Sequence, residues 1–162
     1  MLNRIAISFI SLLSLAAVYA DEQPLAQPAE TQAKLPRQDD FPFTIGFERG
    51  LTEFESGDQI TITDVSGTSD DMESGICRIT GTYTLKSQDE ATLAASVTAR
   101  NRADGRGHWN KAQTMKITKG HGSFTLLLPV NVSGWPHVSF YGKTSSFGGV
   151  YIGTGESVLR HW

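Results

Sequence analysis

Five ring-bearing side chains gather near the C-terminal end of the sequence, at Trp135, His137, Tyr141, Phe147 and Tyr151. Aromatic rings presented on a flat β-sheet can stack on sugar rings or hold a partner chain. We therefore take these five residues as the candidate ligand-binding site. The expected ligand or partner is a glycan or a protein of the cell envelope.

The segments that carry these rings are predicted to form a β-hairpin, with strands at 137–142 and 146–152 and a turn at 143–145. This register keeps the apolar residues on one face and the rings on the other. The expected cross-strand pairs are Val138 with Val150, Phe140 with Gly148, His137 with Tyr151, Tyr141 with Phe147, and Ser139 with Gly149.

Aromatic cross-strand pairs also stabilise sheets and cover their glycines without binding any ligand. We favour this structural role for the ring-bearing face, and the segment 41–47 could also fold over it. The binding interpretation is the competing hypothesis, because the glycines at 148 and 149 leave a gap beside the rings.

Carboxylates cluster between residues 64 and 73, at Asp64, Asp70, Asp71 and Glu73. Calcium prefers oxygen ligands from such loops. The spacing does not match an EF-hand, however, so a solvent-exposed polar loop is the expected structure. We predict no bound metal and no cofactor.

No combination of residues in the sequence indicates a catalytic centre. The histidines never occur at metal-ligand spacing, no serine lies in a Gly-x-Ser-x-Gly elbow, and no phosphate-binding glycine pattern is present. We therefore predict a protein that is not an enzyme. The alternative is a small secreted hydrolase whose acidic residues converge only in the folded chain.

Apolar and polar residues alternate with a period of two from residue 57 onward, which is typical of β-strands. Ile60 and Ile62, for example, alternate with Thr61 and Thr63. A first strand is expected to begin within 43–47. Further strands are expected at 58–65, 76–86, 91–100, 112–118, 122–130, 137–142, 149–153 and 157–160, with a turn at Asp104-Gly105.

Short strands without intervening helices predict an all-β domain over residues 42–162. The expected architecture is an antiparallel β-sandwich of immunoglobulin- or fibronectin-III-like type. The Cys…Trp…Cys pattern of true immunoglobulin domains is absent. A small β-barrel is the alternative.

Residues 1–20 have the anatomy of a secretory signal peptide, with Arg4 before an apolar run and cleavage expected after Ala20. The apolar run is shorter than a bilayer-spanning helix, so we predict no membrane span in the mature chain. Residues 21–41 are rich in proline, glutamine and charge and are expected to form a flexible linker. The predicted location is secreted or periplasmic.

Cys77 is the single cysteine, so no internal disulfide can form and stability must come from the apolar core. In a strand Cys77 points to the same face as Ile79, Tyr83 and Leu85, which predicts a buried, unreactive thiol.

The net charge is −3 at pH 7 and the basic residues are scattered. Nucleic acid is therefore excluded as the expected partner.

Four sequence blocks, at 57–70, 81–85, 137–141 and 146–155, resemble an uncharacterised β-rich domain of exported bacterial proteins. The resemblance implies a secreted β-rich domain from a bacterium. It implies no activity, and no functional residues are carried over from it.

Overall fold

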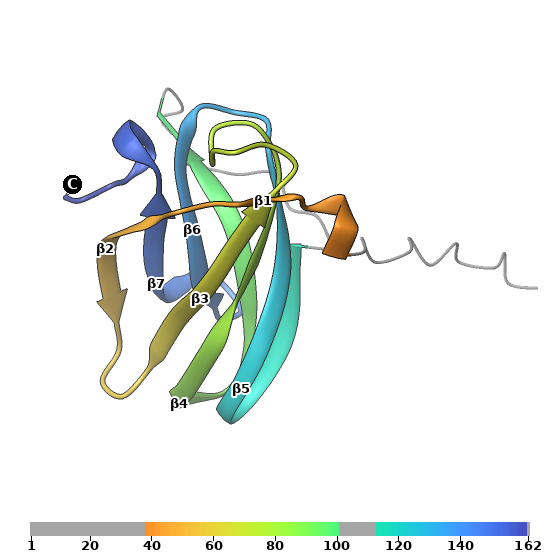
Figure 1. Ribbon diagram of the computed structural model, residues 1–162. Coiled ribbons are helices and arrows are strands. Elements are labelled where there is room, and N and C mark those ends of the chain that lie inside the picture. The colour runs from red at the N-terminus through yellow and green to blue at the C-terminus, as the bar shows by residue number, and fades with distance from the viewer. Residues whose placement is uncertain (1–37, 101–112, 162) are drawn as a thin grey trace, which may run out of the picture. The chain divides into compact units, whose positions relative to one another are not determined.

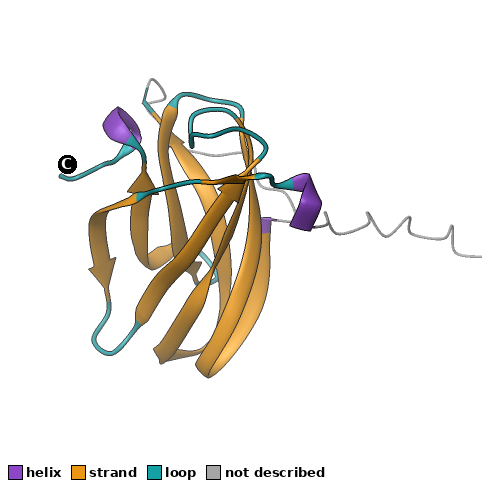
Figure 2. Cartoon of the chain, viewed as in Figure 1, coloured by secondary structure: helices purple, strands orange, loops and turns teal. Residues whose placement is uncertain are grey.

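The computed structural model describes residues 38–100 and 113–161, and these residues are built mostly from β-strands (Figures 1 and 2). The expected signal peptide, nearly all of the expected linker and the Asp104-Gly105 turn lie outside the described residues. Within the described ranges no helix has the length and apolarity that a bilayer crossing needs. The elements are η1 (Gln38–Asp40), β1 (Phe43–Thr44), β2 (Glu48–Phe54), β3 (Gln59–Gly67), β4 (Gly75–Ala99), β5 (Thr114–Val130), β6 (Gly134–Tyr141), β7 (Ser146–Gly153) and η3 (Gly155–Ser157).

The strands form one antiparallel sheet in the order β1-β3-β4-β6-β7-β2, and β5 pairs with β4. The first half of β4 lies between β3 and β5, whereas its second half pairs with β6. The sheet curls into a half-barrel (Figure 1). The prediction of an antiparallel all-β fold is confirmed.

One face of the curled sheet carries a single hydrophobic cluster that includes residues from β3, β4, β5, β6 and β7. Burying this face stabilises the fold by roughly 1.5–3 kcal/mol for each large apolar side chain removed from water. The largest fully buried members are Phe140, Ile60, Met72, Ile79, Leu85, Leu93, Leu126, Leu128 and Ile152.

Cys77 belongs to this core and is fully buried, so the predicted burial of the thiol is confirmed. Burial, with a smaller contribution from the charge of Asp71, raises the pKa of Cys77 to about 11. The nucleophilic thiolate is therefore scarce at neutral pH.

β4 and β5 are each longer than the alternation predicted, because each joins two expected strands. Leu85 pairs with Gly120 and Glu90 pairs with Thr118, so residues 86–89 stand opposite Lys119 alone. The polar run at 86–89 therefore forms a bulge in β4, and a bulge bends a strand and increases its twist. Gly120 has φ 126°, a conformation that side-chain-bearing residues rarely adopt.

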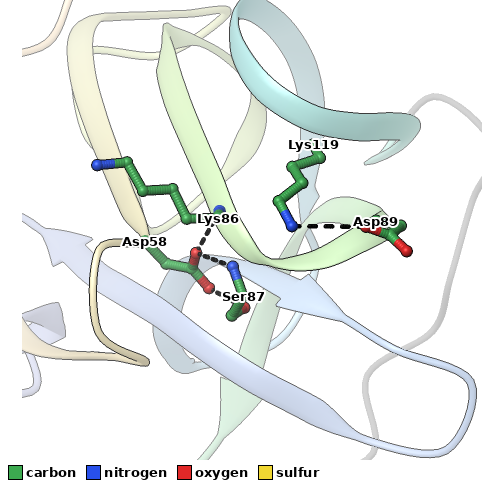
Figure 3. Close-up of polar contacts among 5 residues, drawn as sticks. All are labelled: Asp58, Lys86, Ser87, Asp89 and Lys119. Atoms are coloured by element: carbon green, nitrogen blue, oxygen red, sulfur yellow. Dashed lines mark hydrogen bonds and ion pairs between the residues drawn. The ribbon is translucent and has the colours of Figure 1, made fainter.

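The Asp58 carboxylate holds the chain at this bulge (Figure 3). It accepts hydrogen bonds from the backbone N–H of Lys86 at 2.7 Å and of Ser87 at 3.0 Å, and the Ser87 hydroxyl donates to its second oxygen. Neither Lys86 nor Ser87 has a paired residue in β3 or β5. Asp58 thus supplies acceptors for two N–H groups that the bulge removes from the ladder.

Burial alone would raise the pKa of Asp58, but the hydrogen bonds from Ser87 and Lys86 hold that pKa below its usual value. The ionised carboxylate is therefore the form that the fold favours. Lys119 and Asp89 form a second contact across the same bulge at 3.5 Å (Figure 3), but both side chains are exposed. Such a pair contributes little to stability.

β2 and the C-terminal segment differ from the expected strands. β2 was not predicted, since it is a charged strand at the edge of the sheet and contains a bulge. In this bulge Gly50 and Leu51 both stand opposite Tyr151. The expected strand at 157–160 is wrong, because the chain forms η3 and then runs outside the sheet. There the Leu159 carbonyl accepts a hydrogen bond from the N–H of Leu51 at 2.6 Å.

The segment 41–47 packs near β3 and not over the ring-bearing face of β6 and β7. β1 pairs with the end of β3, and the N–H of Ile45 donates to the Val65 carbonyl at 2.9 Å. The buried Phe41 ring lies under the Arg78 guanidinium, 5.2 Å from its carbon. This segment therefore closes the β3 side of the sheet.

We predict that Asp58→Ala lowers the free energy of unfolding by about 2–4 kcal/mol, because it leaves two N–H groups at the bulge without acceptors. Urea unfolding measures this loss, and Asp89→Ala is the matched control, expected to cost about 0.5 kcal/mol or less. The contribution of Asp58 is present above the pKa of an unfolded aspartate and is lost as the pH falls through its lower folded pKa. Equal losses in the two variants would contradict this role.

Candidate functional site

β6 and β7 form a hairpin in nearly the predicted register. Four expected pairs are confirmed, namely His137 with Tyr151, Val138 with Val150, Ser139 with Gly149, and Phe140 with Gly148. A register shift then follows Phe140, so Tyr141 pairs with Ser146. The predicted pairing of Tyr141 with Phe147 is wrong for that reason.

Four strands contribute a continuous row of residues on the face opposite the core. Ala94 of β4 pairs with Ser139 of β6, which pairs with Gly149 of β7, which in turn pairs with Glu53 of β2. Adjacent strands lie roughly 4.8 Å apart. Ser139 and Glu53 therefore stand on either side of a position that has no side chain.

A pocket of about 250 Å³ opens on this face. A Cβ at position 149 would overlap the Ser139 hydroxyl, so glycine is needed where the strands come together beneath the pocket. The lining residues are Leu51, Glu53, His137, Ser139, Tyr141, Ser146, Phe147, Gly148, Gly149 and Tyr151.

Four of the five residues taken from the sequence as the candidate site line this pocket, and Trp135 does not. Trp135 lies at the start of β6 opposite Thr98, and its half-buried ring is 5.7 Å from the Arg100 guanidinium carbon. Phe147 lines the pocket and also stacks on Phe140, with ring centroids 5.7 Å apart and planes at 16°. Phe147 therefore links the pocket to the core.

His137 is the centre of a buried hydrogen-bond network at the pocket wall. Its Nε2 lies 2.9 Å from the Ser96 hydroxyl, and its Nδ1 lies 3.4 Å from the Thr98 hydroxyl. The Thr98 hydroxyl is also 3.2 Å from the Tyr151 hydroxyl. The Tyr151 ring packs against the imidazole with centroids 4.8 Å apart, so the network fixes both rings in place.

Burial lowers the pKa of His137 to about 4, and a hydrogen bond to the Trp135 carbonyl opposes this effect only in part. The imidazole is therefore neutral at pH 7. A base with this pKa is too weak to activate a serine hydroxyl efficiently at neutral pH. Ser96 is itself buried and does not line the pocket, so the contact between Ser96 and His137 is structural.

The polar groups of the pocket wall suit a ligand that forms hydrogen bonds. Burial raises the pKa of Tyr141, and hydrogen bonds with Ser96 and Ser139 oppose this effect only in part, so its hydroxyl stays protonated at the pocket wall. Ser139 and Ser146 add hydroxyl groups, and Glu53 is the single carboxylate among the described lining residues. One carboxylate cannot supply both the acid and the base or nucleophile of a typical glycoside hydrolase.

The acidic segment 64–73 is not all loop in the described part of the chain, because β3 continues to Gly67 and only the rest forms the turn before β4. No group of three or more His, Cys, Asp or Glu residues placed to hold a metal ion occurs in the described ranges. The Asp71 carboxylate instead accepts hydrogen bonds from the backbone N–H of Glu73 at 2.9 Å and of Ser74 at 3.2 Å. These contacts stabilise the turn before β4.

Sequence reasoning missed several residues of this site, among them Leu51, Glu53, Ser96 and Thr98. Ser96 and Thr98 belong to an expected strand, but only the pairing of β4 with β6 brings them to His137. Glu53 lies in β2, which the alternation did not reveal.

Comparison with protein-family models, curated proteins and solved structures finds no match for this chain. The function is therefore inferred from the geometry of the pocket.

We predict that the folded state loses about 2–3 kcal/mol of stability between pH 6.5 and 4 through His137 alone. The unfolded histidine titrates near pH 6.5 and the folded one at about 4, so the unfolded state binds more protons between these values. The stabilising effect is full above pH 6.5 and declines as the pH falls. Urea unfolding over a pH series measures it.

In the same series His137→Gln is expected to lack this part of the acid dependence, even if the variant is less stable throughout. His121→Gln, a change at an exposed histidine, is expected to retain it. Equal acid dependence in the wild type and His137→Gln would show that His137 is not the group responsible.

Proposed function

We propose that this protein is an exported, non-catalytic binding module whose ligand occupies the pocket between β2, β6 and β7. The observation that carries the proposal is the opening above Gly149, where three half-buried rings and several polar groups converge. A concave site with apolar walls and a few directed polar groups is the usual form of a small-ligand site.

A saccharide ring is the ligand class that these features favour. The rings of Tyr141 and Tyr151 offer flat apolar surface for the C–H face of a sugar. Ser139 and Ser146 offer donors and acceptors for its hydroxyl groups. The volume of about 250 Å³ suits one ring or a short segment of a glycan.

The sequence supports action outside the cytoplasm, in a secreted or periplasmic location. The expected signal peptide at 1–20 would direct export, and the part of the expected linker at 21–41 that precedes η1 would let the domain reach glycans or proteins of the cell envelope. An immunoglobulin- or fibronectin-III-like sandwich remains our proposal for the finer classification of the fold.

The proposal predicts that Tyr141→Ala weakens sugar binding by about tenfold, because one stacking surface and one hydroxyl are lost. Glucose, N-acetylglucosamine and glucosamine are the probes, titrated into the full mature chain and followed by NMR. Tyr83→Ala is the matched control, since Tyr83 is a half-buried tyrosine of β4 that does not line the pocket.

At least one of the three sugars is expected to bind the wild type, and the control is expected to keep that affinity. The proposal fails if none of the probes binds. It also fails if Tyr141→Ala and Tyr83→Ala, both confirmed as folded by circular dichroism, bind the sugar equally well.

A further inference from the structure

Glu53 carries the one carboxyl group among the described residues that line the pocket. We infer that the pocket selects a ligand with a positively charged amine, such as an amino sugar, an inference that rests on the proposed function.

The position of Glu53 in β2 places its side chain on the pocket face. Its neighbour Phe54 packs against Phe140 of the core, with ring centroids 6.0 Å apart. Successive side chains of a strand point to opposite faces. Glu53 therefore points away from the core and stands beside Gly149, with which it is paired.

The Glu53 carboxylate has no hydrogen bond or ion pair with any described residue. Glu48 of the same strand contrasts with it, because Glu48 pairs with Arg160 at 2.6 Å. No Lys or Arg of the described ranges lines the pocket. An arriving cation would thus meet an unneutralised carboxylate.

The remaining walls favour a cation over an anion. The faces of aromatic rings attract ammonium groups, and Tyr141, Phe147 and Tyr151 supply three such rings. His137 is neutral because burial holds its pKa at about 4, so it adds no positive charge at neutral pH. The described lining therefore carries a net negative charge.

The test compares three pyranoses that differ in charge, namely glucosamine, glucose and glucuronate, at about pH 6, where the glucosamine amine is protonated. The wild type is expected to bind glucosamine about three- to tenfold more tightly than glucose, as one exposed ion pair with a cation–π contact allows. Glucuronate is expected to bind most weakly. NMR titration of the full mature chain gives the three affinities.

Glu53→Gln is expected to abolish the preference for glucosamine while leaving glucose affinity within about twofold. Glu55→Gln removes the same charge from an exposed glutamate outside the pocket, and it is expected to keep the preference. Both variants should unfold at the same urea concentration as the wild type, since neither carboxylate has a partner among the described residues.

The inference is overturned if glucose binds the wild type as tightly as glucosamine, or if glucuronate binds more tightly than either. It is also overturned if Glu53→Gln keeps the preference, or if Glu55→Gln loses it. In these cases the pocket still binds sugars and the proposed function stands. If none of the three sugars binds, the inference fails, and the proposed function fails with it unless N-acetylglucosamine binds.

Discussion

The bend in β4 and β5 is the constraint on which the rest of the structure depends, and the Asp58 carboxylate holds it. A bulged strand exposes N–H groups that its ladder no longer satisfies, and burying them without acceptors would be costly. Asp58 provides those acceptors for Lys86 and Ser87 from the start of β3. The first half of β4 can then pair with β3 and the second half with β6, while β5 pairs with both, and the sheet curls around one core.

The candidate site follows from this curl. Because the second half of β4 pairs with β6, its hydroxyl residues reach His137 and fix the rings at the pocket wall. Because β2 adds to the far edge of β7, an acidic side chain stands across Gly149 from Ser139. The core face of the sheet stabilises the fold through the burial of apolar side chains. The opposite face can therefore carry polar groups and the pocket.

Local patterns in the sequence predicted most of the strands and most of the hairpin register, since period-two alternation and turn spacing are properties of neighbouring residues. The same patterns could not reveal that residues 86–89 of β4 form a bulge opposite Lys119 of β5, because these segments meet only across a long-range pairing. β2 was missed because an edge strand with a bulge need not alternate. Glu53 and Ser96 could not be assigned to the site from the sequence, because pairing between strands that are distant in sequence brings them there.

We propose that a small ligand occupies the pocket above Gly149. Amide chemical shifts of the ¹⁵N-labelled protein, recorded while glucosamine is added, locate the residues that the ligand contacts. We expect the largest changes at residues of the pocket, with Ser139, Ser146, Gly148 and Gly149 foremost, and little change along β3. Saturable changes centred on β3 or β5, with the glycines of β7 unaffected, would contradict it.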